Sequence, residues 1–444
     1  MLSELLESAK VLALFDTDHE IRRMEKLHGI SLAGKQREAV ERSVTDGVLI
    51  VTGGPGTGKT TILRFIIELM ERQQLRFELA APTGRAAKRI SETTGKDART
   101  IHRLLEYSAS EESFVRDNKN PLKADAVIID EMSMVDISLF HALLKALEKG
   151  TRLIMVGDVD QLPSVGPGNV LRDMVDSGSV PVIRLNEIFR QSGRSSIVTN
   201  AHLVNEGRMP DLGMYEDFQF YACPSAAVAL ESVKNLCSDY AYIGKSGEIQ
   251  VLSPMKSNLL GVFNLNAALQ QELNPPSEDK TEYKFGETVF RVGDRVMQIR
   301  NNYELEWVKR VASRSAQSGS GVFNGDIGTV MEIDTGSSQM TVLFDDERSV
   351  DYSFSLLDEL ELAYCISVHK SQGSEFSTVV LPLVNGPRML FNRNILYTAI
   401  TRARHTVVIL GTAECVHQMV NNCNVRKRYS ALCRFIIERR EGSV

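Results

Sequence analysis

The chain has 444 residues, of which 43% are hydrophobic and 24% charged, and its formal net charge is −6. This length exceeds a single hydrophobic core and predicts two or more domains of ordinary globular composition. No apolar run is long enough to span a membrane and no signal-peptide pattern opens the chain, so we expect a cytoplasmic protein without a membrane partner. The negative charge does not exclude nucleic acid, because binding depends on local charge.

The six cysteines include no Cys-x-x-Cys pair. They predict reduced thiols in the cytosol, and a zinc site among Cys415, Cys423 and Cys433 is the alternative.

Residues 1–30 place apolar side chains at helical spacing, which predicts a helical lead-in. A short helix follows within residues 31–40 and carries Gln36. A glutamine amide can both donate and accept hydrogen bonds, so Gln36 is a candidate reader of an adenine edge. An ordinary surface glutamine is the alternative.

The strongest motif runs from Gly53 to Thr61 and contains Gly54, Pro55, Gly56, Thr57, Gly58, Lys59 and Thr60. It lies between a predicted buried strand, 48–51, and a predicted helix, 62–70, which is the context of a P-loop. Backbone N–H groups and the helix N-terminus can cradle phosphates there. Lys59 can neutralise the β- and γ-phosphates and Thr60 can bind Mg²⁺, so the chain is predicted to bind a nucleoside triphosphate.

A basic cluster follows the second predicted strand. It comprises Thr83, Arg85, Lys88 and Arg89 after Pro82, and then Arg99, His102 and Arg103. Open α/β sheets place ligands at the carboxyl ends of their strands, so we expect phosphate contacts here; a solvated helix face is the alternative.

Residues 106–123 are polar with isolated aromatic side chains and predict a protruding hairpin. The strand that follows ends in Asp130 and Glu131. Asp130 can hold Mg²⁺, and Glu131 can orient or deprotonate the attacking water. After the next strand, Gln161 is predicted to sense the γ-phosphate, and Arg190 is a candidate second cation over the triphosphate.

The second half of the chain contains strand-like runs at 249–253, 363–368 and 378–384 but no second P-loop. It is therefore expected to close over the nucleotide rather than bind one itself. Short alternating strands from residue 293 onward suggest a small inserted β-barrel, with a basic Ser/Gly-rich loop at 309–321 as a possible DNA contact.

A polar loop begins at His369, and residues 394–404 predict a helix that ends with Arg402 and Arg404 before a buried strand at 406–411. Arg402 is predicted to reach the γ-phosphate, because a guanidinium stabilises the charge of phosphoryl transfer. A surface helix arginine is the alternative.

In this order the motifs resemble those of superfamily 1 helicases, and specifically the RecD-like DNA helicases that move 5′ to 3′. The matching segments are 53–61, Ile129-Asp-Glu-Met-Ser-Met134, Gly157-Asp-Val-Asp-Gln-Leu-Pro163, His369-Lys-Ser-Gln-Gly-Ser-Glu-Phe376 and Tyr397-Thr-Ala-Ile-Thr-Arg-Ala-Arg404. The match extends from Gln36 to Thr412. Only 52 residues precede Gly53, whereas full-length family members carry a large region before the ATPase core.

The resemblance implies an α/β fold with two RecA-like P-loop domains built on parallel sheets and ATP between them. A β-hairpin, the pin, would be inserted in the first domain, and an SH3-like β-barrel in the second. The implied boundaries are 1–30 for the lead-in, 31–190 for the first domain with the pin at 106–123, 191–292 and 361–412 for the second, 293–360 for the barrel, and 413–444 for a C-terminal tail.

The same resemblance implies the site residues. The catalytic set would be Lys59, Asp130, Glu131, Gln161, Arg190 and Arg402, with Thr60 and Asp130 on Mg²⁺. The nucleotide would contact Gln36, Gly54, Pro55, Gly56, Thr57, Gly58, Lys59, Thr60, Thr61 and Glu375. Single-stranded DNA would contact Pro82, Thr83, Arg85, His102, Asn324, His369, Lys370, Ser371 and Thr398.

The expected function is that of a monomeric ATP-dependent DNA helicase. Its expected partners are single-stranded DNA, single-strand/duplex junctions and proteins of repair or recombination. Two alternatives stay open: a superfamily 1 RNA helicase, and a motor or clamp subunit of a larger complex that binds DNA without separating strands.

Overall fold

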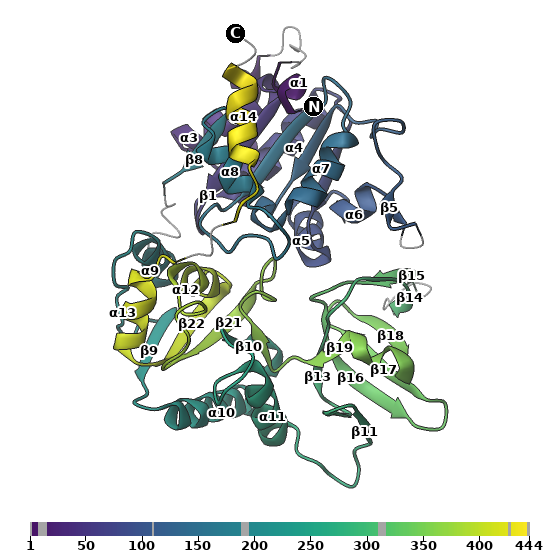
Figure 1. Ribbon diagram of the computed structural model, residues 1–444, viewed down its shortest axis with the longest axis vertical. Coiled ribbons are helices and arrows are strands. Elements are labelled where there is room, and N and C mark those ends of the chain that lie inside the picture. The colour runs from purple at the N-terminus through teal and green to yellow at the C-terminus, as the bar shows by residue number, and fades with distance from the viewer. Residues whose placement is uncertain are drawn as a thin grey trace. The chain divides into compact units, whose positions relative to one another are not determined.

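The computed structural model describes residues 2–7, 16–108, 111–187, 195–309, 317–424 and 428–441. The chain forms two compact units, of which unit 1 comprises Met1–Val198 and Val425–Val444 and unit 2 comprises Thr199–Asn424 (Figure 1). In the part of the chain that the structure describes, no helix has the length and apolar character needed to cross a membrane.

Unit 1 is built on a six-stranded sheet in the order β3-β2-β6-β7-β1-β8, and all of its pairings are parallel. Its strands are β1 (Val48–Gly53), β2 (Phe77–Ala81), β3 (Ala98–Thr100), β6 (Ala126–Ile129), β7 (Arg152–Gly157) and β8 (Val182–Leu185). Because the strands are parallel, the loops that follow β1, β2, β6 and β7 lie at one edge of the sheet.

Helices cover both faces of this sheet (Figure 1). They are α1 (Leu2–Glu7), α2 (Thr17–His28), α3 (Gly34–Thr45), α4 (Lys59–Arg72), α5 (Gly84–Thr94), α6 (Ile101–Leu104), α7 (Ile137–Lys145), α8 (Val170–Asp176) and α14 (Leu432–Glu441), with the 3₁₀ turn η1 (Met132–Met134). The expected lead-in thus contains α1 and α2, while residues 8–15 lie outside the described part. Within 106–123, β4 (Tyr107–Ser108) and β5 (Ser113–Phe114) pair as an antiparallel hairpin.

Unit 2 contains a five-stranded parallel sheet in the order β20-β10-β21-β22-β9. Its strands are β9 (Phe218–Ala222), β10 (Ile249–Ser253), β20 (Cys365–Ser367), β21 (Phe376–Leu383) and β22 (Ala403–Gly411). Its helices are α10 (Ala226–Tyr242), α11 (Val262–Leu273), α12 (Arg393–Ile400) and α13 (Ala413–Asn421), with the turn η2 (Ser246–Glu248); α9 (Ser196–Asn205) spans the boundary of the two units in sequence.

The region expected to form an SH3-like barrel is a seven-stranded antiparallel sheet in the order β15-β14-β18-β17-β16-β13-β19. Its strands are β13 (Arg295–Gln298), β14 (Asn302–Lys309), β15 (Gln317–Val322), β16 (Ile327–Asp334), β17 (Gln339–Phe344), β18 (Arg348–Ser353) and β19 (Leu360–Leu362), and η3 (Phe354–Glu359) joins the last two. A separate pair, β11 (Glu282–Phe285) and β12 (Thr288–Arg291), precedes it. The sheet encloses its own apolar core.

Two predicted elements are wrong. The predicted loop 309–321 contains β15, because residues 317–322 continue the ladder of β14 and Gly319 lets the Trp307 ring pass; a Cβ there would lie 2.5 Å from that ring. The predicted helix 394–404 ends at Ile400, and β22 already begins at Ala403, where it pairs with Phe376. Pairing with a neighbouring strand overrode a loop-like composition in the first segment and helical spacing in the second.

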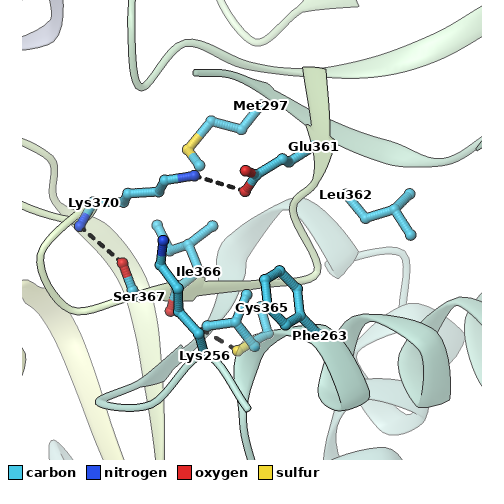
Figure 2. A pocket seen from close by; sticks show the side chains of 10 residues that line it. Lys256, Phe263, Met297, Glu361, Leu362, Cys365, Ile366, Ser367 and Lys370 are labelled. Atoms are coloured by element: carbon cyan, nitrogen blue, oxygen red, sulfur yellow. Dashed lines mark hydrogen bonds and ion pairs between the residues drawn. The ribbon is translucent and has the colours of Figure 1, made fainter. Parts of the chain in front are cut away.

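The parallel and antiparallel sheets of unit 2 meet at a small pocket (Figure 2). Its lining includes Lys256 and Phe263 from one side and Met297 from the antiparallel sheet. Lys370, in the loop after β20, forms a 2.6 Å ion pair with Glu361 of β19. This ion pair links the polar loop that begins at His369 to the antiparallel sheet.

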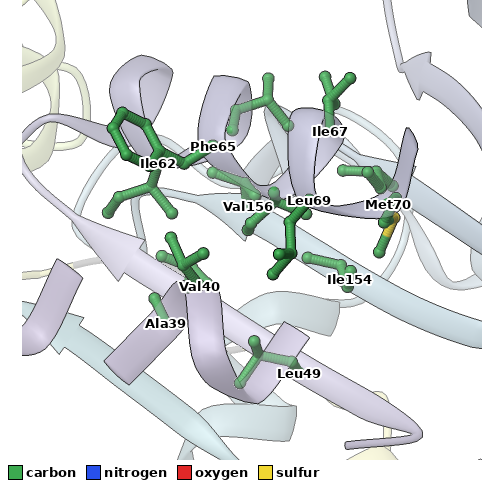
Figure 3. Packing of buried hydrophobic residues seen from close by; sticks show 14 of the residues in the cluster. Ala39, Val40, Leu49, Ile62, Phe65, Ile67, Leu69, Met70, Ile154 and Val156 are labelled. Atoms are coloured by element: carbon green, nitrogen blue, oxygen red, sulfur yellow. The ribbon is translucent and has the colours of Figure 1, made fainter. Parts of the chain in front are cut away.

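The core of unit 1 lies on both faces of its sheet because successive strand residues point to opposite sides. Leu49 and Val51 of β1 pack with α3 and α4 on one face, where Figure 3 shows the cluster around Phe65. Val48 and Ile50 face the other side, which packs against α7 and α8. Helix α14 completes that second face, with Leu432 and Ile436 in contact with the cluster.

Candidate active site

The P-loop of unit 1 has the geometry that phosphate binding requires. Gly58, at the start of α4, has a φ of 83°, which L side chains rarely adopt. At Gly53 a Cβ would lie 2.8 Å from both Leu185 Cβ and Thr57 Oγ1, so this position has no room for a side chain. The Thr57 hydroxyl donates to the carbonyl of Gly54 at 2.8 Å and closes the loop.

Lys59 lies folded against its own loop. Its Nζ donates to the carbonyl oxygens of Gly53 at 2.6 Å and Gly54 at 2.9 Å. An ammonium group can only donate hydrogen bonds, and here the two carbonyl oxygens accept the bonds that the phosphate oxygens of a nucleotide could accept. A bound triphosphate would therefore compete with two neutral acceptors for Lys59.

Gln36 forms a hydrogen bond with the backbone of the P-loop. Its Nε2 donates to the carbonyl of Thr57 at 2.9 Å, and its Oε1 accepts from the backbone N–H of Ala33 at 3.1 Å. The side chain is buried, so the alternative of a surface glutamine is wrong. The side-chain amide of Gln36 uses both its nitrogen and its oxygen in hydrogen bonds to protein atoms. Its assignment as an adenine reader stays a prediction.

Asp130 and Glu131 follow β6 as a buried acidic pair. Asp130 Oδ1 accepts from the backbone N–H of Glu131 at 2.8 Å, and Glu131 has a left-handed φ of 52°. Burial and the neighbouring carboxylate raise the pKa of Asp130 above its usual value, while the charges of Arg89 and Lys59 oppose this rise. Carboxylate and hydroxyl oxygens are the ligands that Mg²⁺ prefers, so Asp130 and Thr60 fit this ion chemically.

Arg89 of α5 contacts both carboxylates. Its Nη2 lies 3.3 Å from Glu131 Oε1 and 3.9 Å from Asp130 Oδ2. The alternative of a solvated helix face is therefore wrong for Arg89, although Lys88 beside it is exposed. An arginine from the strand-helix unit next to β6 supplies the counter-charge of the acidic pair.

The loop after β7 holds Gln161 through Asp158. Gln161 Nε2 donates to Asp158 Oδ2 at 3.2 Å, and the backbone N–H of Asp160 donates to Asp158 Oδ1 at 3.0 Å. The backbone N–H of Val159 donates to Thr52 Oγ1 of β1 at 3.2 Å. This loop is thereby tied to the strand that leads into the P-loop.

The turn before α5 contains Pro82 and Thr83, and Arg85 lies in the first turn of the helix; all three are partly accessible. Thr83 caps the helix, because its Oγ1 accepts from the backbone N–H of Ala86 at 3.2 Å. His102 instead joins an aromatic group at the base of the hairpin, where its ring centroid is 5.7 Å from those of both Tyr107 and Phe114. Burial lowers the pKa of His102, so the neutral ring is favoured.

In unit 2, the loop after β20 brings together three predicted DNA contacts. Lys370 is paired with Glu361, as Figure 2 shows, and its backbone N–H donates to Ser367 Oγ at 3.3 Å. The Ser371 hydroxyl donates to the carbonyl of Val368 at 2.7 Å and is fully buried. His369 begins this loop. The ammonium group of Lys370 is the charge that could bind a DNA phosphate.

Arg402 is buried within unit 2, so the alternative of a surface helix arginine is wrong. Its Nη1 donates to the carbonyl of Ser374 and its Nε to that of Thr398, both at 3.3 Å. Thr398 has no exposed surface. Glu375 Oε2 accepts from Arg404 Nε at 3.1 Å. The assignments of Arg402 and Glu375 to the nucleotide and of Thr398 to DNA stay predictions.

Two further assignments cannot be placed on the catalytic loops. Arg190 lies outside the described residues. Asn324 lies in the turn between β15 and β16, where its backbone N–H donates to Asn301 Oδ1 at 3.0 Å. For the zinc alternative, the described residues contain no group of three or more His, Cys, Asp or Glu side chains suited to a metal.

Known proteins are similar to this chain in sequence and in fold. Residues 36–167 match the family model described as an AAA domain, 265–344 the ATP-dependent RecD-like DNA helicase SH3 domain, and 362–410 the UvrD-like helicase C-terminal domain. The RecBCD enzyme subunit RecD of Mycobacterium tuberculosis is 30% identical over 433 residues, which cover 88% of this chain and 71% of that protein. The chain belongs to the RecD-like family of superfamily 1 helicases.

The ATP-dependent RecD2 DNA helicase of Deinococcus radiodurans is 34% identical to this RecD-like chain over 382 residues. The match covers 86% of the chain and 49% of the relative, so the RecD-like chain spans about half the length of that protein. A Bacteroides Pif1 helicase, solved with ADP-AlF3 and ssDNA, has the same fold, with a TM-score of 0.52, 20% identity and coverage of 93% of this chain and 98% of that one.

Three residues of this RecD-like site have roles that sequence reasoning missed. Thr52 and Asp158 hold the Gln161 loop, and Arg89, which had been grouped with phosphate-binding residues, contacts Glu131 instead. A signal for Arg89 was present in the sequence. Two adjacent buried carboxylates require a nearby cation, and the adjoining strand is followed by a basic helix.

Proposed function

We propose that this chain is an ATP-dependent DNA helicase that moves 5′ to 3′ along single-stranded DNA and separates duplex DNA. The observation that carries the proposal is the meeting, at one edge of the unit 1 sheet, of the P-loop, the Asp130–Glu131 pair and the Gln161 loop. Membership of the RecD-like family supports the choice of DNA and the direction of movement.

The residues of unit 1 divide the work of hydrolysis. Lys59 exchanges its two backbone carbonyl partners for phosphate oxygens when the triphosphate binds. Thr60 and Asp130 would hold Mg²⁺, which neutralises phosphate charge when it is bound. Glu131 orients the attacking water as a general base. Gln161 senses the γ-phosphate through a loop that Asp158 and Thr52 hold in place.

Arg190 and Arg402 would stabilise the negative charge of the transition state. For Arg402 this requires exchange of its bonds to the carbonyls of Ser374 and Thr398, which are neutral acceptors and therefore weaker than phosphate. Lys370 would bind a DNA phosphate in competition with Glu361. Both exchanges make ligand binding the event that rearranges unit 2.

An unwinding assay on the purified chain tests the proposal, with duplexes that carry either a 5′ or a 3′ single-stranded tail. We expect ATP-dependent separation of the 5′-tailed duplex. The control is Lys59→Ala, which should abolish ATP turnover and leave weak DNA binding that decreases with salt. Undiminished turnover in Lys59→Ala would refute the ATP site, and separation of only the 3′-tailed duplex would refute the direction.

A second candidate function is that of a motor subunit in a larger repair or recombination complex. It is favoured by the similarity to proteins named as RecD subunits of the RecBCD enzyme. DNA-stimulated ATPase activity without strand separation by the isolated chain would support it. Equal stimulation by matched RNA and DNA oligonucleotides would instead favour an RNA helicase.

A further inference from the structure

The Arg89–Glu131 ion pair connects DNA binding with ATP hydrolysis, the two activities of unit 1 that the proposed function requires. Arg89 lies on α5, whose first residues follow the turn of predicted DNA contacts, and Glu131 is the predicted general base. Strands β2 and β6 are parallel neighbours, so α5 and the Glu131 loop start from the same edge of the sheet. Arg89 Nη2 of α5 lies 3.3 Å from Glu131 Oε1 in that loop.

This ion pair restricts Glu131 chemically. The Glu131 side chain is 8% exposed and that of Arg89 is 21% exposed, so water screens the pair only partly. While Oε1 is directed at a guanidinium, it is less available to accept a hydrogen bond from an attacking water. The left-handed backbone of Glu131 is a strained conformation that the surrounding contacts must maintain, and Arg89 is one of these contacts.

Helix α5 provides the mechanical connection. It runs from Gly84 to Thr94, is capped by Thr83, and carries Arg89 one turn after Arg85. A DNA phosphate that binds Thr83 or Arg85 acts on the first turn of a helix whose second turn carries Arg89, the partner of the predicted general base Glu131. A small shift or rotation of α5 is therefore sufficient to lengthen a 3.3 Å contact.

We propose that Arg89 is a positioning residue that restrains Glu131 in the absence of DNA, and that binding of a single strand at Pro82–Arg85 withdraws Arg89 from Glu131. This inference rests on the proposed function and deepens it, because it supplies the route by which DNA stimulates ATP hydrolysis. The coupling is reciprocal, so release of Glu131 also favours DNA binding at the turn.

The test compares Arg89→Gln with Lys88→Gln, a matched loss of one positive charge on the same helix. Lys88 belongs to the same basic cluster, but its side chain is exposed and its Nζ lies 3.7 Å from Glu92 Oε1 of the same helix, so it is outside the ATP site and the proposed DNA-binding turn. Steady-state ATPase rates are measured with and without a saturating oligo-dT strand, together with the KM for ATP. Arg89→Gln should raise the DNA-free kcat several-fold, with little change in the KM for ATP, and bring the stimulation ratio close to one. Lys88→Gln should keep the wild-type ratio.

Arg89→Lys keeps the charge but not the planar fork of donors, so its stimulation ratio should be intermediate. If thermal unfolding shows that Arg89→Gln does not fold, Arg89→Lys replaces it in the test. A wild-type ratio in both Arg89 variants would overturn the inference, and so would a lower DNA-stimulated kcat with an unchanged DNA-free kcat.

Glu131→Gln separates this failure from that of the proposed function. If Glu131→Gln abolishes hydrolysis while the Arg89 variants behave as wild type, the catalytic assignment stands and only the restraint is refuted. If Glu131→Gln retains full hydrolysis, the catalytic assignment itself is wrong and the proposed function of this site fails with it.

Discussion

The adjacent carboxylates of Asp130 and Glu131 lower the stability of unit 1. Both side chains are largely buried, and the rise in the pKa of Asp130 means that its charged form is disfavoured in the folded protein. Arg89 and Lys59 offset this penalty in part. In the proposed Mg²⁺ site this pair carries excess negative charge until the ion binds, and the charge opposes folding in the absence of the ion.

Asp130→Asn should therefore abolish ATP turnover and raise the melting temperature of the metal-free protein. A gain of about 1 kcal/mol corresponds to about 2–4 °C for a domain of this size. Because the folded-state pKa of Asp130 is raised, the penalty is fully present above that pKa and disappears as the pH falls below the unfolded-state value. Thermal unfolding of both proteins across this pH range measures the effect, and an equal or lower melting temperature at neutral pH would contradict it.

At the residue scale, roles are easier to predict from the sequence than contacts are. The roles of Lys59, Asp130 and Gln161 are predicted from motifs of fixed spacing next to predicted strands, and these roles stay predictions. The contact of Arg89 with Glu131 is harder to predict, because the two residues are 42 positions apart and meet only through sheet order; the need of two buried carboxylates for a cation is the sequence signal that points to it. The same limit applies to Arg402, whose burial does not follow from local spacing.

The hairpin of β4 and β5 is held at its base by packing rather than by a long strand ladder. The Tyr107 and Phe114 ring centroids are 5.1 Å apart, and both rings contact His102. On the far side, the backbone N–H of Leu122 donates to the carbonyl of Ala146 at 2.8 Å. These contacts fix where the hairpin leaves unit 1, and its assignment as the pin stays a prediction.

Replacement of residues 108–121 by a short Gly/Ser linker tests that assignment. Leu105 and Leu122 stay in the core, so the fold of unit 1 and its ATP site should be retained. We expect DNA-stimulated ATPase activity close to wild type and no separation of a 5′-tailed duplex. Unwinding at the wild-type rate would remove the hairpin from the mechanism.

Element prediction succeeded where strands were buried on both faces. Strand β10 has the predicted limits, 249–253, and α4 begins at Lys59, three residues before the predicted helix 62–70, as the P-loop requires. It was wrong at β15, where a Ser/Gly-rich segment suggested a loop. The decisive contact there is the Trp307 ring over Gly319, which only the folded pairing of β14 and β15 creates.

The C-terminal segment belongs to unit 1 although unit 2 separates it from the rest of that unit in sequence. Arg428 Nη1 donates to the carbonyls of Gly166 at 2.6 Å and Gly168 at 2.8 Å, in the loop before α8. Ser430 bonds Asp173, and α14 then packs on α8. No local pattern in the sequence indicates that this segment returns to the first unit. The domain boundaries drawn from the sequence stay predictions.

Arg428→Ala should lower the free energy of unfolding of unit 1 by about 1 kcal/mol, because charged hydrogen bonds to two carbonyls are lost at a partly exposed position. Arg434→Ala is the matched control. Arg434 is 79% exposed and pairs with Glu438 on the same helix, so its loss should change stability by less than about 0.5 kcal/mol. Urea unfolding measures both. Equal effects would show that Arg428 does not anchor the segment.

The return of α14 to unit 1 also has a consequence for biosynthesis. Leu432 follows Glu187 by 245 positions, so at ribosomal speeds it is added roughly 10–50 s after the last strand of the first sheet. Throughout that interval the apolar surface of α8 against which α14 later packs lacks this cover in the nascent polypeptide. We therefore expect this surface to be a binding site for chaperones until α14 has been synthesised.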